Sequence, residues 1–363
     1  MPGVVLEIVF GVIIGPQVLA IVHPGPARDF LALFGLWMLF LMAGFEMDPA
    51  VLLGRPLRNA VRGWAMTALI ALGVAMLLSG AGVVRAPILT ALAVSTTAIG
   101  ALLPVLRDAG LLRPPYGPMV LAAGAMGEAG PVVALSLVLA GQGAPEHALI
   151  ILAFAVGAIA LGAAAARAST GRFYHIVERT MGTSGQLPVR LAIFVLILLV
   201  AVSAKLDIDL VLGAFVAGAV ARAALHHHHH ETFSARLDGL GSAFLVPIFF
   251  VASGTRLDIA ALLSSPVVLM MIPVYAVLML AARGAPALLL YRRDLSPSQR
   301  IALALHSGTQ LPLVVAITSL AVQRGLMPSG QAAALVGAAI LTVILFPALA
   351  RSFLSEKSKH QPA

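Results

Sequence analysis

The chain has 363 residues, of which 60% are hydrophobic and only 10% charged, and it contains no cysteine. A soluble globular domain is about a quarter charged, so this composition argues against a soluble protein, and the missing cysteines exclude disulfide and thiol chemistry. The net charge of +8 comes mainly from basic residues in loops between apolar segments. A membrane protein explains this pattern better than nucleic-acid binding does.

Apolar segments of about 20 residues follow one another along the chain, and about 20 helical residues cross the hydrocarbon core of a bilayer. They predict an all-α polytopic membrane protein with about 12 transmembrane helices, surrounded by lipid. The first segment carries Glu7 and lacks the basic start of a signal peptide, so we count it as a span. The predicted spans are residues 4–21, 30–47, 62–79, 87–105, 117–140, 147–166, 188–203, 208–224, 239–254, 264–290, 299–321 and 331–350.

Positive charges in the predicted loops set the orientation of these spans. With a cytoplasmic N-terminus, 17 of the 23 Lys and Arg residues lie on the cytoplasmic side, 5 lie on the other side, and Arg283 lies inside a span. An excess of basic residues is typical of cytoplasmic loops. We therefore expect a multi-pass protein of the cell membrane with both termini in the cytoplasm.

Two spans carry residues that break helices at mid-membrane. The fourth contains Ser95-Thr96-Thr97 before Gly100, and the eleventh contains the run 306–310, HSGTQ, before Pro312. Broken helices are tolerated where the freed backbone groups face protein or a watery cavity. The two spans enter from opposite sides, which predicts inverted five-helix repeats whose broken helices cross at an ion site. The alternative is that these small residues merely let helices pack closely.

Glu128 lies in the middle of the fifth predicted span. A charged side chain at that depth costs about 3 kcal/mol or more, and such residues usually mark ion or proton pathways. Function is therefore expected to centre on this carboxylate.

Several segments resemble the cation–proton antiporter-2 superfamily, the branch that holds Kef-type and Nap-type exchangers. The matching strings run in order along nearly the whole chain: Glu7–Pro16, Leu39–Glu46, Ser95–Thr97, Arg113–Glu128, Val211–Gly218 and Pro247–Val251. The resemblance implies exchange of Na⁺ or K⁺ for protons by an elevator-like, alternating-access mechanism, and a homodimer. It also implies one transmembrane domain, 1–351, with a moving core (62–140 and 264–350), a scaffold (4–47 and 188–254) and a short cytoplasmic tail, 352–363.

The chain departs from this family pattern at several points. Gly127 stands where Asp or Asn is usual before the essential acid, and Gln310 stands where an acid is common in the eleventh span. The resemblance implies a further helix before Glu7, which the sequence given does not include, either because its start is late or because the protein is a short form. No attached nucleotide-sensing domain is expected, since the sequence ends at Ala363. These departures affect the identity of the transported ion more than the fold.

A single carboxylate can hold one proton or one small cation but not both, and this competition is itself an exchange mechanism. Oxygen ligands suit hard alkali cations, and the two helix breaks supply hydroxyl, amide and backbone oxygens. We predict a proton and cation site formed by Glu128, Ser95, Thr96, Thr97, Thr309 and Gln310. Because one charge is bound in either state, the exchange is expected to be electroneutral.

Two further ionisable residues lie in predicted spans. Arg283 cannot deprotonate, and an unpaired guanidinium in hydrocarbon is costly, so we expect it to be the charge partner of Glu128. The alternatives are a locked salt bridge without transport and a side chain that reaches the cytoplasmic surface near Tyr291. His306 is a candidate proton relay or pH sensor, or else satisfies a buried hydrogen bond.

The run His226–His230 is expected to lie in a solvated cytoplasmic loop, with adventitious Zn²⁺ or Ni²⁺ binding or gating by protonation as alternatives. The principal alternative function is a cation channel or solute carrier on the same fold without proton coupling. An enzyme is not expected, because no nucleophile–base set, metal-ligand pair or phosphate-binding glycine loop is present. No cofactor is expected besides the transported Na⁺ or K⁺ and H⁺.

Overall fold

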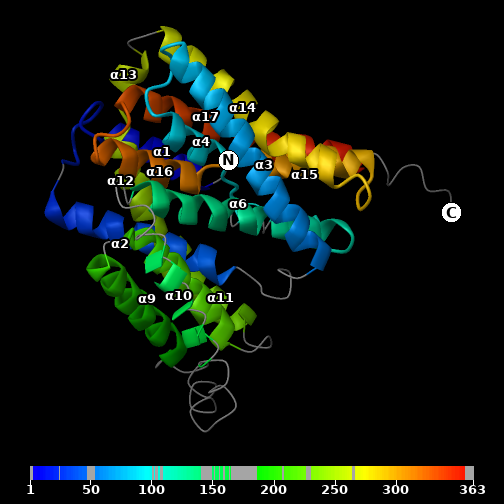
Figure 1. Ribbon diagram of the computed structural model, residues 1–363. Helices are drawn as coiled ribbons and strands as arrows, with labels where there is room; N and C mark the ends of the chain where they lie inside the picture. The colour runs from blue at the N-terminus through cyan, green and yellow to red at the C-terminus, as the bar shows by residue number, and fades with distance from the viewer. Residues whose placement is uncertain are drawn as a thin grey trace. The chain divides into compact units, whose positions relative to one another are not determined.

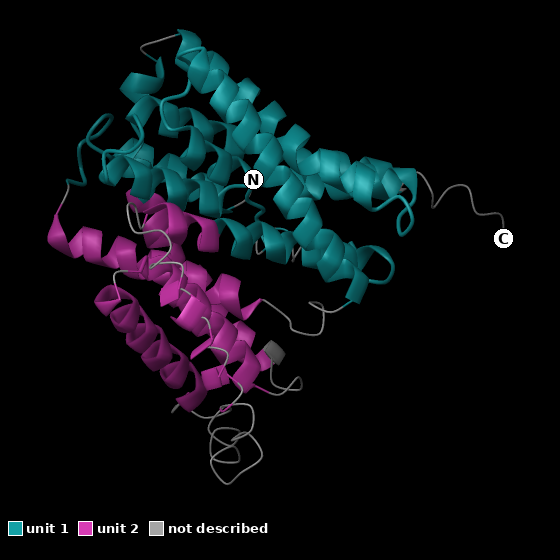
Figure 2. Cartoon of the chain, viewed as in Figure 1, with its two compact units in different colours: residues 1–23, 50–131, 253–363 teal, residues 24–49, 132–252 magenta. Residues whose placement is uncertain are grey.

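Helices form the regular structure of the two compact units into which the chain divides (Figures 1 and 2). The computed structural model describes residues 3–23, 25–46, 54–99, 109–139, 186–206, 208–225, 230–263 and 266–355, with short pieces between 102 and 106 and between 149 and 164. The first unit comprises residues 1–23, 50–131 and 253–363, and the second comprises 24–49 and 132–252.

The first unit contains both predicted broken helices. Within it, α14 packs against α3, α15 and α17, and α4 packs against α3 and α16. A buried apolar cluster that includes Tyr116, Leu303 and Phe346 joins α6, α15 and α17. Its helices are α1 (Gly3–Ile14), α3 (Gly54–Gly80), α4 (Pro87–Val94), α6 (Tyr116–Leu139, as far as Pro131), α13 (Ile259–Leu263), α14 (Pro266–Leu290), α15 (Pro297–Gly308), α16 (Pro312–Gln323) and α17 (Ser329–Ser355).

The second unit is held together by a close approach of two helix backbones. A Cβ atom on Gly44 of α2 would collide with the carbonyl of Phe215, and one on Gly218 of α10 would collide with that of Leu41. Small residues at such crossings are typical of helices that associate in lipid. The helices of this unit are α2 (Pro26–Phe45), α9 (Leu187–Lys205), α10 (Leu210–Ala224), α11 (His230–Leu240), a π-helical turn (Gly241–Leu245) and α12 (Val246–Arg256, as far as Ala252).

The described helices agree with ten of the predicted spans. Eight of them are long and apolar enough to cross a membrane, and α1 and α10 are shorter apolar helices at the first and eighth predicted spans. The fourth span is described only in part, and the sixth, 147–166, lies largely outside the described residues. The predicted all-α membrane fold is confirmed, whereas the count of twelve and the inverted repeat stay predictions.

The first predicted span, 4–21, is wrong at its C-terminal end, because α1 ends at Ile14. Gly15 precedes Pro16, and the residue before a proline is biased away from the helical region. The chain turns instead, with the Ala20 N–H donating to the Gly15 carbonyl at 2.8 Å. The resemblance assigned this segment to the scaffold, but residues 1–23 belong to the unit of the broken helices. The roles of core and scaffold stay predictions.

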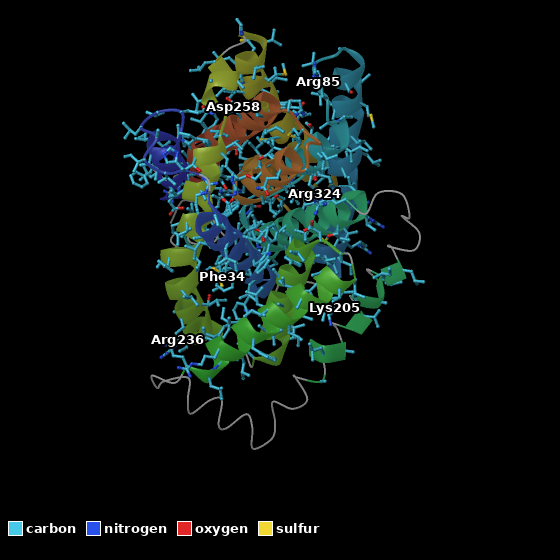
Figure 3. The ribbon with its side chains drawn as sticks, turned by 90° about the vertical axis from the view of Figure 1, so that its left-hand side faces the viewer. Phe34, Arg85, Lys205, Arg236, Asp258 and Arg324 are labelled. Atoms are coloured by element: carbon cyan, nitrogen blue, oxygen red, sulfur yellow. The ribbon has the colours of Figure 1, made fainter. Side chains whose placement is uncertain are left out.

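Asp258, labelled in Figure 3, ties together three loops of the first unit. Its Oδ2 accepts a hydrogen bond from the Ser329 hydroxyl at 2.8 Å, and its Oδ1 accepts one from the Ala261 N–H at 2.8 Å. In addition, the Ile259 N–H donates a hydrogen bond to Gln17 Oε1 at 2.8 Å. The carboxylate therefore lies over the N-terminus of α13, where a negative charge is favourable.

Candidate ion-binding site

Both predicted helix breaks are present in the structure. Helix α4 ends at Val94 and residues 95–98 are not helical, while residues 309–311 separate α15 from α16. Proline at the start of α16 suits a first helical turn, where no N–H donor is needed. The breaks expose backbone groups at the centre of two apolar spans, so these groups need partners other than lipid.

Hydroxyl groups beside the breaks bond to the ends of the interrupted helices. Ser95 Oγ donates to the Leu92 carbonyl and Thr96 Oγ1 to the Ala93 carbonyl, both at 2.9 Å. Thr309 Oγ1 donates in the same way to the carbonyl of residue 305, at 3.0 Å. Such local bonds weaken the competing helical conformation. The three hydroxyls thus help to form the breaks that the sequence predicted.

The two breaks cross and bond directly to each other. The Ala98 N–H donates to the Thr309 carbonyl at 2.9 Å, and Gln310 Nε2 donates to the Val94 carbonyl at 2.6 Å. Thr96 Oγ1 lies 3.2 Å from Gln310 Oε1. The structure therefore brings together the predicted polar residues of both spans, and all of them are at most 2% exposed: Ser95, Thr96, Thr97, Thr309 and Gln310.

Glu128 of α6 reaches the same crossing. Its side chain is 6% exposed, and its Oε1 accepts a hydrogen bond from the Ile99 N–H at 3.0 Å. Ile99 follows the break, where the second half of the fourth span begins. Backbone N–H groups at the start of a helix favour a carboxylate. The predicted acid is thus held at the break rather than elsewhere along its span.

Pro131 explains how α6 joins the break. It lies four residues after Gly127 and has no N–H, so the Gly127 carbonyl loses its helical donor. The Thr97 N–H supplies a replacement, at 3.0 Å from that carbonyl. This contact fixes the residue next to Glu128 against the broken helix. The sequence carried the signal, a proline three residues after the acid, but the sequence analysis did not use it.

Arg283 of α14 is 5% exposed and bonds to neutral oxygens. Its Nε donates to the Ser307 carbonyl at 3.2 Å, its Nη2 donates to the Ala123 carbonyl at 3.0 Å, and Nη2 also donates to the Thr97 hydroxyl. That hydroxyl donates in turn to the Ser307 carbonyl at 2.8 Å. The guanidinium thus connects α6, α14, α15 and the break of the fourth span.

The expected pairing of Arg283 with Glu128 is wrong for this conformation. Within the described part of the chain, the hydrogen bonds of Arg283 are those with Ser307, Ala123 and Thr97. The guanidinium does not reach the surface either. Its Nε and Nη2 bond instead to the Ser307 and Ala123 carbonyls and the Thr97 hydroxyl, and sequence distance alone cannot reveal these contacts.

His306 is fully buried one residue before Ser307. Its Nδ1 lies 2.6 Å from the Tyr116 hydroxyl, and its Nε2 has no hydrogen-bond partner among the described residues. This bond links α15 to the start of α6. The role of His306 as a proton relay stays a prediction. Of the run His226–His230, residues 226–229 lie outside the described residues.

Thr342 of α17 belongs to the site but was missed by the sequence analysis. Its hydroxyl accepts a hydrogen bond from the Gln310 N–H at 3.0 Å and lies 3.1 Å from the Gln310 carbonyl. It therefore supports the break of the eleventh span from a different helix. A lone threonine in an apolar span gives no signal of such a role.

Comparison with known proteins places the chain in a family. A model of the family "Sodium/hydrogen exchanger, transmembrane" matches residues 1–354. The chain is 27% identical to the putative Na⁺/H⁺ antiporter YjbQ of Bacillus subtilis over 369 residues, which cover 96% of this chain and 58% of that protein. It is 24% identical to the Na⁺/H⁺ antiporter NhaS4 of Synechocystis, over 72% of this chain and 68% of that protein.

The solved structure of the sodium proton antiporter MjNhaP1 from Methanocaldococcus jannaschii is similar in fold, with a TM-score of 0.69 and 18% identity over 97% of this chain and 92% of that one. The chain spans less than two thirds of the length of YjbQ. The family match and the antiporter names of the relatives confirm the resemblance noted in the sequence. These relatives are named as transporters and not as enzymes. The chain belongs to the transmembrane sodium/hydrogen exchanger family.

Proposed function

We infer that this protein exchanges Na⁺ or K⁺ for H⁺ across the membrane, with Glu128 carrying the proton and the cation in turn. The observation that carries this proposal is the position of the Glu128 carboxylate at the crossing of two broken helices, 3.0 Å from the Ile99 N–H. Membership of the exchanger family and the antiporter names of its relatives support it.

The surroundings of Glu128 suit a hard cation. Thr97, Thr309 and Gln310 bring hydroxyl, amide and carbonyl oxygens to the crossing, and each is almost fully buried. Oxygen ligands of this kind are preferred by hard cations over nitrogen or sulfur. A dehydrated Na⁺ or K⁺ and a proton would therefore compete for one carboxylate. The exchange chemistry itself uses side chains of the protein and the transported ions.

The exchange is electroneutral in this proposal. Glu128 accepts one positive charge, either as H⁺ or as a monovalent cation, while Arg283 keeps its charge throughout because a guanidinium does not deprotonate in proteins. The loaded site therefore has the same charge in both directions. A membrane potential would then not drive transport, and a pH gradient would.

The setting of this transport is also proposed. The chain would work as a homodimer in the cell membrane with both termini in the cytoplasm, and the elements around the broken helices would move as the transporting core. Apolar side chains on lipid-facing surfaces support the membrane setting; Leu69 and Leu77 of α3, for example, are 71% and 75% exposed.

Everted membrane vesicles provide the test. A respiration-driven pH gradient is followed with a fluorescent dye, Na⁺ or K⁺ is added, and wild type is compared with Glu128→Gln. Antiport predicts cation-dependent recovery of fluorescence that the variant lacks. Retained cation flux in Glu128→Gln would instead identify a channel or an uncoupled carrier, and no response of the wild type to either cation would overturn the proposal.

A further inference from the structure

A small pocket lies beside Arg283, within the first unit. Its volume is about 10 Å³, and its lining includes Trp64 and Thr67 of α3, Arg283 of α14, and Tyr291. About 10–15 Å³ is the room that one water-sized group needs. The pocket is therefore matched to a single small ligand rather than to an organic molecule.

Two donor groups at this pocket, on Arg283 and Trp64, have no hydrogen-bond partner among the described residues. Arg283 uses Nε and Nη2 for its bonds to protein, which leaves the two N–H groups of Nη1. Trp64 Nε1 is buried without a hydrogen-bond partner. Tyr291, whose hydroxyl can also donate, lines the same pocket and is 2% exposed. An indole N–H and a guanidinium can only donate, so the pocket is rich in donors.

Carboxylates do not balance these donors. Among the described residues that line the pocket there is no Asp or Glu. Asp294, which acts electrostatically on Tyr291, accepts a hydrogen bond from Asn59 at 3.1 Å and lies 3.9 Å from Arg55. The Thr67 hydroxyl donates its hydrogen to the Gly63 carbonyl at 2.9 Å, so toward the pocket it can only accept a hydrogen bond. A buried guanidinium without an anionic partner is unfavourable.

We propose that this pocket binds a monovalent anion of the size of chloride against Arg283, Trp64 and Tyr291. Donors that converge around a fixed positive charge favour an anion over water, because an anion accepts from all of them and also offsets the charge. The anion would neutralise the guanidinium that braces the helix breaks through Thr97 and Ser307. Binding is independent of the transport activity of the chain.

A consequence for transport rests on the proposed function. Arg283 bonds to Thr97, which lies in the break next to the Glu128 site, and its positive charge opposes a cation there. A bound anion reduces that repulsion. Exchange should therefore reach half its maximal rate at a lower Na⁺ concentration in chloride than in gluconate, at equal ionic strength.

Thermal unfolding of the purified full chain tests binding itself. The unfolding temperature is measured in detergent with increasing chloride, and ionic strength is held constant with gluconate. Binding predicts a rise of roughly 2 °C for each tenfold increase in chloride above the dissociation constant. Tyr291→Phe and Trp64→Phe each remove one donor and should move the dependence to higher chloride. The matched control Thr318→Val, which alters a hydroxyl bonded within α16, should leave it unchanged.

Trp64 also provides a direct signal, since the chain has 2 tryptophans. In a Trp37→Phe background, added bromide should change the Trp64 fluorescence along a saturable curve that chloride competes away. A linear, non-saturable response together with equal unfolding temperatures in chloride and gluconate would overturn the proposal and leave water as the occupant. Because neither readout needs transport, their failure is distinguishable from failure of the antiport proposal.

Discussion

The guanidinium of Arg283 lies where a side chain at residue 127 would stand. A Cβ atom built on Gly127 would be 2.6 Å from Arg283 Nη2 and 2.6 Å from Thr97 Cβ. Glycine is therefore a condition for the contacts of Arg283 with the break. Gly127, the residue that departs most from the antiporter pattern, thus leaves the space that Arg283 occupies, although Arg283 lies 156 positions further along the chain.

Gly127→Ala is expected to disturb this arrangement. The methyl group has to displace Arg283 or Thr97, and overpacking of this kind typically costs about 1–3 kcal/mol. We expect a lower unfolding temperature and slower exchange. The matched control is Gly73→Ala in α3, because a Cβ there meets nothing within 4 Å. Wild-type stability and exchange in Gly127→Ala would mean that the guanidinium does not need this space.

Thr97→Val is expected to loosen the crossing of the helices. The change removes the donor to the Ser307 carbonyl at 2.8 Å and one acceptor of Arg283. A buried polar group that loses its partner costs about 1–3 kcal/mol, more when it is charged. Thr318→Val, whose hydroxyl donates to Val314 at 2.7 Å within its own helix, should cost less. Thermal unfolding of the two variants side by side checks this order, and equal losses would contradict it.

Gln310→Glu is expected to make exchange dependent on pH in a new way. The amide nitrogen donates to the Val94 carbonyl at 2.6 Å, which a protonated carboxyl can also do but an ionised one cannot. Relative to wild type, the variant should therefore work better at acidic than at alkaline pH. Gln323→Glu at the exposed end of α16 is the control. A ratio of exchange rates between Gln310→Glu and wild type that is constant across pH would argue against the Val94 contact.

The sequence predicted the spans and the two breaks because apolar length and helix-breaking residues are local properties. It also drew attention to Glu128, whose carboxylate lies at the break, since a carboxylate in an apolar span stands out whatever its neighbours are. The breaks then proved to cross, as the paired positions of Ser95–Thr97 and Thr309 suggested. These features depend on the bilayer, which constrains every span in the same way.

The remaining features depend on contacts between distant helices. Arg283 bonds to the Ser307 carbonyl beside the break between α15 and α16, and Thr342 supports Gln310 from α17. The bond between His306 and Tyr116 joins residues 190 positions apart. Periodicity and composition carry no information on such pairs. The early end of α1 could have been predicted, because Gly15-Pro16 is a local signal for a helix end. The prediction of residues 4–21 followed the apolar length of the segment instead.

Asp258→Asn is expected to lower stability at neutral pH but not in acid. The Ala261 N–H, the Ser329 hydroxyl and Gln17 hold the pKa of Asp258 below its ordinary value of 3.8. A depressed pKa in the folded state means that the carboxylate stabilises the fold above its unfolded pKa, and that this contribution is lost as the pH falls through the folded pKa. Unfolding temperatures of wild type and variant should differ at neutral pH and converge at the acidic end. A constant difference would contradict the role of the charge.

Competition between a proton and a cation for Glu128 is tested most directly by proton release. Purified protein in weak buffer with a pH indicator is mixed with Na⁺ or K⁺ near the pH at which Glu128 is partly protonated. A single shared carboxylate predicts saturable release of no more than about one proton per chain, none from Glu128→Gln, and normal release from Gly73→Ala. Release that persists in Glu128→Gln would contradict the account, because another group would then exchange its proton for the cation.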